Sequence, residues 1–198
     1  MTRPLVLASS SPQRQAILHQ LKIPFEVVAP QYVEIDPADA DPIELVRRHA
    51  EGKARSVHTR GRLTLGVDTT VHVDGHVLAK PDDDVSARMM LERLSGRRHD
   101  VVSGVCLLGT GPEVVAHAVT TVFFRPLVGR EIDAYIATCE WKGRAGGYAI
   151  QGLAGRFVTR IEGDYLNVVG LPAAVLVDLL MRHAPWVLGF SEPGGDDH

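Results

Sequence analysis

The most constraining feature of the sequence is the stretch L-V-L-A-S-S-S-P-Q-R at residues 5–14. An apolar run of strand length ends at three serines, and Pro12 then opens a segment with helical spacing. A strand that turns into a helix N-terminus presents backbone N–H groups with no partner inside the helix, at the positive end of its dipole. Arg14 adds a permanently charged guanidinium that matches phosphate oxygens. The stretch therefore indicates an anion site, although a serine that only caps the helix gives the same pattern.

The composition narrows the class of protein. The chain has 198 residues, of which 45% are hydrophobic and 23% charged, and its formal net charge is −3. No basic stripe typical of nucleic-acid binders is visible, and no apolar run approaches the roughly 20 residues that span a bilayer. We therefore expect neither a nucleic acid polymer nor a membrane as a partner. Cys106 and Cys139 lack disulfide or metal-site spacing, so we expect a cytoplasmic protein.

The pattern of apolar residues predicts an α/β fold. Strands are expected at 5–8, 25–28, 63–67, 99–108, 114–124 and 157–161, with a hairpin at 71–77. Helices are expected at 12–21, 42–57, 85–94, 131–138 and 172–183. Together they predict one two-lobed domain over 1–190, with a long mixed twisted sheet, flanking helices and a central cleft, and a disordered tail at 191–198. Ligands in such sheets lie beyond the carboxyl ends of strands.

Several charged residues are candidates for chemistry. Asp68 directly follows the strand L-T-L-G-V and precedes Thr69, which is a frequent position for a metal ligand or a general base. An aspartate that only starts a turn is the alternative. Lys53 lies on the apolar stripe of its helix, and Lys80 is held extended by the proline that follows it. Both are candidates for one polyphosphate, although lysines on apolar faces usually reach out to solvent.

Two further residues carry weaker signals. Glu34, in Q-Y-V-E-I-D, lies in a segment that is neither clearly strand nor helix, and most such acids are solvated. Gln151, in G-G-Y-A-I-Q-G, has an amide that both donates and accepts, which suits reading the edge of a base. An ordinary glycine-rich turn gives the same pattern.

Taken together, the motifs resemble the Maf family of nucleoside triphosphate pyrophosphatases. The matching stretches are L-A-S-S-S-P-Q-R, E-G-K-A, G-V-D-T-T-V, the K-P after the hairpin, L-S-G-R-R-H-D-V, A-G-G-Y-A-I-Q-G and I-E-G-D-Y-L-N-V-V-G-L-P. They follow the family order from residue 5 to about 183. The resemblance implies a fold related to the inosine-triphosphatase architecture, a homodimer, and hydrolysis of a nucleoside triphosphate to the monophosphate and pyrophosphate.

The resemblance also implies roles for single residues. The residues that would form the catalytic cleft are Ser9, Arg14, Glu34, Lys53, Asp68 and Lys80. Asp68 would be the proton acceptor, and Glu34 with Asp68 would hold Mg²⁺ or Mn²⁺. Ser9 and Ser11 are expected to contact the substrate.

The base-selecting positions fall at Gln13, Thr69 and Gln151. Thr69 and Gln151 are similar to the subgroup that acts on dTTP and UTP. Gln13 departs from that subgroup, which usually carries a second arginine before Arg14, so a broader range of bases remains open.

Two other functional classes are compatible with parts of the sequence. A non-catalytic nucleotide-binding regulator of septum formation is one alternative. The full set of acidic and basic residues expected of a catalytic cleft argues against it. A nucleotidyltransferase is another, but its phosphate loops are normally rich in glycine, whereas this loop carries serines.

Overall fold

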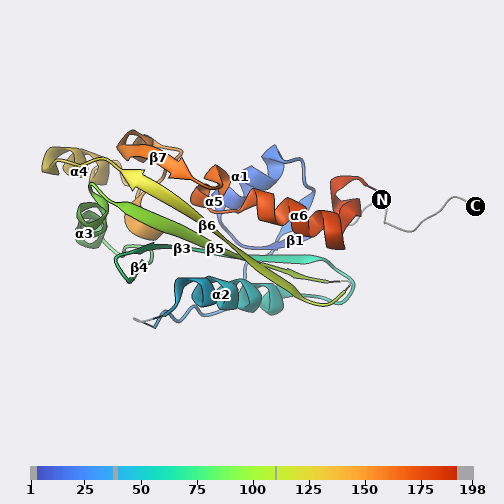
Figure 1. The fold of residues 1–198 in the computed structure, drawn as a ribbon. Helices are drawn as coiled ribbons and strands as arrows, with labels where there is room; N and C mark the ends of the chain where they lie inside the picture. Colours follow the sequence, from blue (N-terminus) through green and yellow to red (C-terminus); the bar gives the residue numbers. More distant parts are fainter. Residues whose placement is uncertain (1–3, 38–39, 110, 191–198) are drawn as a thin grey trace, which may run out of the picture.

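The computed structural model describes residues 4–37, 40–109 and 111–190 (Figure 1). Within these residues, seven strands form one sheet in the order β2-β1-β3-β5-β6-β7, and β4 pairs with β3. The strands are β1 (Leu5–Ala8), β2 (Phe25–Val27), β3 (Thr64–Val73), β4 (His76–Leu78), β5 (Arg98–Leu108), β6 (Val114–Phe124) and β7 (Val158–Glu162). The pairs β1–β2 and β1–β3 are parallel and the others antiparallel, so the predicted mixed sheet is confirmed.

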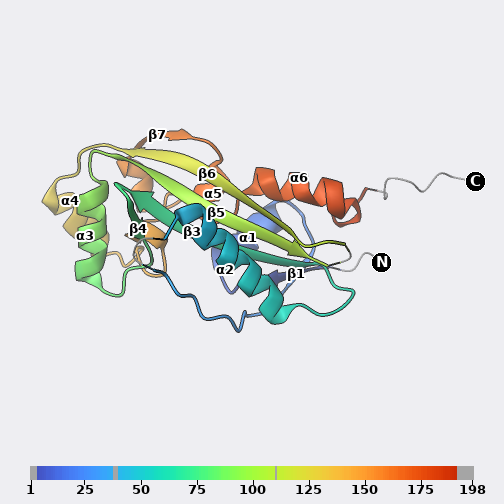
Figure 2. The same cartoon turned by 60° about the horizontal axis from the view of Figure 1, so that its bottom comes forward.

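Helices cover both faces of this sheet. They are α1 (Pro12–Gln20), α2 (Pro42–Val57), α3 (Asp84–Leu94), α4 (Gly129–Ile136), α5 (Tyr165–Val169) and α6 (Ala173–His183), with short 3₁₀ helices at Ala145–Gly147, Leu153–Phe157 and Pro185–Leu188. Figures 1 and 2 show α2 on one face, α1, α5 and α6 on the other, and α3 beside α4 at the far end of the long strands. No helix in the described part of the chain is long and apolar enough to cross a membrane. The predicted tail at 191–198 lies outside the described residues.

Two large apolar cores lie along the long strands, and a small third cluster of Ala50, Ala54 and Cys106 lies between α2 and the sheet. One contains Leu5, Leu18 and Leu176 and joins β1, α1 and α6 to the sheet. The other contains Leu91 and Phe157 and joins α3 and α4 to the opposite end of β5 and β6. Both cores share the same sheet, so the space between them is bounded by one continuous set of strands.

Helix α2 lies unusually close to the sheet. Asp41 caps its N-terminus by accepting from the backbone N–H groups of residues 43 and 44, at 2.9 and 3.0 Å, and Pro42 follows at the first helical position. A Cβ at Gly66 would lie 2.0 Å from the carbonyl oxygen of Ala50, and one at Gly104 would lie 2.3 Å from that of Val46. These two strand glycines therefore let the helix backbone rest directly on β3 and β5.

Strand β3 is longer than the sequence indicates. The expected strand stopped at residue 67, with Asp68 at its carboxyl end, but β3 continues to Val73 and Asp68 lies in its middle, opposite Gly104 of β5. The prediction was wrong because an ion pair with α2 lets a charged residue continue a buried strand. On the other edge, β1 ends at Ala8 opposite Gly66, and β4 begins to pair only at Val71. Residues 67–70 thus have a neighbouring strand only on the β5 side.

We predict that Gly104→Ala destabilises the protein strongly, because the new methyl group would meet the backbone of α2. Overpacking of this kind costs about 3 kcal/mol of the free energy of unfolding. Urea denaturation would measure the loss. Gly129→Ala is the control, since nothing lies within 4 Å of its Cβ position, and equal stability of the two variants would contradict the close approach of α2.

Candidate active site

A cavity of about 410 Å³ lies between the two cores, beside residues 67–70 of β3, which have a neighbouring strand on one side only. Nine of the predicted site residues line it: Ser9, Ser11, Gln13, Arg14, Glu34, Lys53, Thr69, Lys80 and Gln151. The tenth, Asp68, is buried beneath and bonded to Lys53. Residues from six separate stretches of the chain therefore meet at one place.

The serine loop after β1 forms one wall, and Arg14 fixes its shape. The guanidinium donates to Ser9 Oγ at 3.0 Å, to Thr69 Oγ1 at 3.3 Å and to the carbonyl oxygen of Gly170 at 2.9 Å. Ser11 is the N-cap residue of α1, but its hydroxyl donates to Gln13 Oε1 at 3.1 Å and makes no capping bond. The first turn of α1 therefore faces the cavity without a side-chain cap, as the anion-site interpretation requires.

The floor of the cavity holds a buried ion triad. The ammonium of Lys53, on α2, lies 2.5 Å from Asp68 Oδ1 and 2.7 Å from Glu34 Oε1. Lys53 and Asp68 are 5% and 7% exposed, whereas the side chain of Glu34 is about one-third exposed. The two carboxylates thus converge on a single cation, one from the strand and one from the segment before α2.

The charges around Asp68 decide its ionisation. Burial alone would raise the pKa of Asp68, but the positive charges of Lys53 and Arg14 and the Lys53 hydrogen bond outweigh it, so this pKa lies below its ordinary value. Burial lowers the pKa of Arg14, and the carboxylates of Asp68 and Glu34 oppose that effect. Asp68 is consequently an ionised carboxylate at neutral pH.

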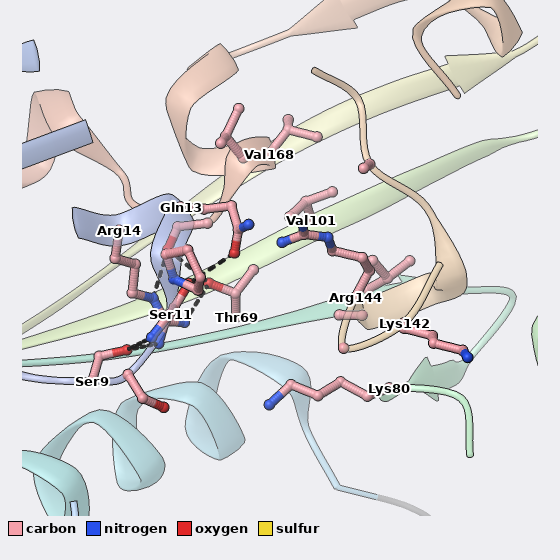
Figure 3. Close-up of a pocket in the computed structure, with 18 of the residues that line it drawn as sticks. Ser9, Ser11, Gln13, Arg14, Thr69, Lys80, Val101, Lys142, Arg144 and Val168 are labelled. Carbon is pink, nitrogen blue, oxygen red and sulfur yellow. Dashed lines mark hydrogen bonds between the residues drawn. The ribbon is translucent and has the colours of Figure 1, made fainter. Parts of the chain in front are cut away.

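The wall opposite the serine loop adds more cations. Figure 3 shows Lys80 and Arg144 reaching into the cavity, while Lys142 points away from it. Arg144 is half-buried, and its Nε has no hydrogen-bond partner among the described residues. Gly143 and Gly146, at φ +71° and +68°, shape the loop that carries it. A guanidinium that is held in a cavity without a partner is available to an anionic or carbonyl-bearing ligand.

Thr69 lies on the opposite face of β3 from Asp68, because successive strand residues alternate. Its hydroxyl is 2.8 Å from Ser103 Oγ, so its position is fixed by β5. Apolar side chains of Val71, Val101 and Val168 complete this part of the cavity. A planar apolar group with polar edges would find both a wall and hydrogen-bonding partners here.

The structure brings together the predicted residues and adds one that the sequence analysis missed. Arg144 lies in the glycine-rich stretch, where glycines predict a turn but give no direction for the side chain between them.

Three of the chain's four lysines, Lys53, Lys80 and Lys142, line the cavity. The described residues contain no group of three or more His, Cys, Asp or Glu side chains suited to a metal ion. A cation at Glu34 and Asp68 would therefore need further oxygens from a ligand.

Known proteins similar to the chain share most of its length. A family model described as Maf-like protein matches residues 4–183. A dTTP/UTP pyrophosphatase of Symbiobacterium thermophilum is 49% identical over 180 residues, covering 90% of this chain and 93% of that protein. One of Thermococcus gammatolerans is 46% identical over 173 residues, covering 87% and 92%. Among solved structures, a Staphylococcus aureus Ham1 protein gives a TM-score of 0.44 at 12% identity, covering 62% of this chain and 72% of that one.

We predict that the stability contributed by Asp68 depends on pH. Its pKa is lower in the folded protein than in the unfolded chain, so its contribution is present above about pH 4 and is lost as the pH falls further. Asp68→Asn should therefore lower the free energy of unfolding by about 2 kcal/mol at pH 7 and by progressively less in more acidic buffer. Urea denaturation of both proteins from pH 7 down to pH 3 would measure this, and a pH-independent difference would contradict it.

Proposed function

Because the chain belongs to the Maf family, we propose that it hydrolyses dTTP or UTP at the α–β phosphoanhydride, releasing the nucleoside monophosphate and pyrophosphate. Relatives that are 42–49% identical over about nine-tenths of the chain carry the name dTTP/UTP pyrophosphatase. The observation that carries the proposal is the buried Lys53 bound to two carboxylates in a cavity otherwise rich in cations. This arrangement supplies a base and a charge-stabilising group in a cavity of about 410 Å³.

The cations of the cavity suit a triphosphate. Arg14, Lys53 and Lys80 face the space beside the serine loop, where the helix N-terminus also favours negative charge. The protein has a net charge of −3, so these clustered cations, and not the overall field, must attract the substrate. Their fixed positions would stabilise the charge that builds on the departing pyrophosphate.

Asp68 is the proton acceptor in this proposal. A water attacks the α-phosphorus and its proton passes to the Asp68 carboxylate, while the bond to the bridging oxygen breaks and pyrophosphate leaves. Phosphate oxygens that compete for the Lys53 ammonium would weaken its hold on Asp68. Because the positive charge of Lys53 is one cause of the low pKa of Asp68, this competition would make the carboxylate a better proton acceptor.

The donor set suits a divalent cation such as Mg²⁺ or Mn²⁺. Glu34 and Asp68 offer two hard carboxylate ligands, and both already lie against the same positive group, the Lys53 ammonium. Mg²⁺ is commonly held by one or two carboxylates together with substrate phosphates. When bound there, the metal would neutralise phosphate oxygens and lower the pKa of a bound water.

The base would lie against the apolar wall beside Thr69, with Gln13 and Gln151 at its edge. Uracil and thymine present two carbonyl acceptors around one N–H donor, and the two glutamine amides can match both kinds of group. Gln13 carries no charge where the dTTP and UTP subgroup usually has an arginine. We therefore include nucleotides with bases other than thymine and uracil among the proposed substrates. The homodimer and the single domain over 1–190 stay predictions, which light scattering and limited proteolysis would test.

We predict that Asp68→Asn abolishes turnover while substrate binding persists. Loss of a general base costs about a hundredfold or more in kcat, whereas Arg14, Lys53 and Lys80 still contact the phosphates. Pyrophosphate release from dTTP and UTP with Mg²⁺, and nucleotide binding by calorimetry, would measure the two effects. Release of single orthophosphate by the unaltered protein would contradict the proposed reaction.

We also predict that Arg144→Gln raises KM about tenfold. A charged hydrogen bond to the substrate contributes on the order of 1.4–3 kcal/mol, and the buried Nε has no alternative partner among the described residues. Arg98→Gln is the control because it removes the same charge from an exposed strand position outside the cavity. Equal KM values for the two variants would rule out contact between Arg144 and the nucleotide.

A further inference from the structure

The segment at residues 28–37 carries Glu34 to the cavity but has no regular secondary structure. It runs from β2 to the loop before α2, and little apolar surface holds it. Val33 and Ile35 are 78% and 70% exposed. The position of Glu34 therefore depends on polar contacts between this segment and its neighbour, α2.

Those contacts form a row along α2. Asp36 lies 2.7 Å from His49 Nε2, the Tyr32 hydroxyl lies 3.0 Å from His49 Nδ1, and Glu34 lies 2.7 Å from the Lys53 ammonium. Arg48 also donates to the carbonyl oxygen of residue 35, at 3.1 Å. Tyr32, Glu34 and Asp36 thus all reach α2, and the exposed Val33 and Ile35 alternate with them as in an extended chain.

His49 is the centre of this row. It is 1% exposed, and both of its ring nitrogens are bonded to the segment, one on each side of Glu34 in the sequence. It also lies one helical turn before Lys53, on the same face of α2. His49, which bonds to the segment, and Lys53, which bonds to Glu34, therefore lie on the same helix, α2.

Gly52 completes the arrangement. A Cβ at this position would lie 2.2 Å from Cε2 of Tyr32, so the tyrosine ring occupies the place of a side chain on α2. The Tyr32 and His49 rings also meet edge to face, with their centroids 5.6 Å apart. Glycine inside a helix is unfavourable, so the gap at residue 52 needs another cause, and the ring of Tyr32 supplies one.

We propose that His49, with Tyr32 and Asp36, is a positioning residue that holds Glu34 at the cation-binding place beside Asp68. The inference rests on the proposed function, in which Glu34 is a ligand of the divalent cation. Loosening the segment should weaken the hold on the cation more than it slows the chemical step, since Asp68, Lys53 and Lys80 lie on other elements.

The first test compares His49→Leu with His49→Gln. Leucine removes both hydrogen bonds, whereas glutamine keeps an N–H donor that can reach Asp36. In the metal-free protein, the amide of Gln31, whose N–H donates to Ser56 Oγ at 3.2 Å, should exchange its hydrogen at least fivefold faster in His49→Leu and at an intermediate rate in His49→Gln. The Mg²⁺ concentration for half-maximal pyrophosphate release should rise about five- to tenfold in His49→Leu, with kcat at saturating Mg²⁺ within twofold.

Gly52→Ala keeps the inference testable if His49→Leu fails to fold. Alanine favours the helix over glycine, whereas its methyl group would displace the half-exposed Tyr32 ring and break the bond between Tyr32 and His49. The two effects on the thermal midpoint oppose each other, so the variant should still fold. The Gln31 amide should exchange faster and the Mg²⁺ requirement should increase. Glu51→Ala, at the adjacent position outside the row, is the matched control and should change neither quantity.

Two results would overturn the inference. One is unchanged exchange of the Gln31 amide in both His49→Leu and Gly52→Ala. The other is faster exchange with an unchanged Mg²⁺ requirement, or a fall in kcat alone. If the unaltered protein releases no pyrophosphate at any Mg²⁺ concentration, the proposed function fails instead, and the exchange measurement still decides whether His49 holds the segment.

Discussion

The contact of α2 with the sheet is the constraint on which the rest of the structure depends. Only because Gly66 and Gly104 lack side chains can the helix backbone rest on β3 and β5, and only at that distance does the Lys53 ammonium reach Asp68. A buried carboxylate in the middle of a strand is costly unless it is paired. The close packing and the ion triad therefore require each other, and both belong to the floor of the cavity.

The same helix also connects the sheet to the segment at residues 28–37. One face of α2 packs on β3 and β5 through Val46, Ala50 and Ala54, while its polar row receives the segment that carries Glu34. Across β3, Arg14 bonds the serine loop to Thr69 and to the chain after α5. The cavity is thus built on both faces of one strand, and this explains how residues so distant in the sequence converge.

Local patterns in the sequence predicted most of the strands and helices, although not α5. The serine loop, the lysine on α2 and the K-P dipeptide each carry a signal of their own for residues that the structure gathers at the cavity. They failed at Asp68, where a charge looks like the end of a strand unless its ion pair with Lys53 of α2 is known. They also missed Arg144 and the row around His49. Which way a loop side chain points, and which glycine makes room for a distant ring, are consequences of tertiary contacts.

The short stretch of β3 at 67–70 lacks a neighbouring strand on one side, and this bears on how the protein avoids aggregation through an open strand edge. A bare strand edge ordinarily invites another chain to add to the sheet. Here β1 and β4 flank the opening at both ends, so it is too short to template an intruding strand. Val67, Asp68 and Thr70 are also buried, at 0%, 7% and 5% exposed, so this gap in the strand pairing offers no seed for aggregation.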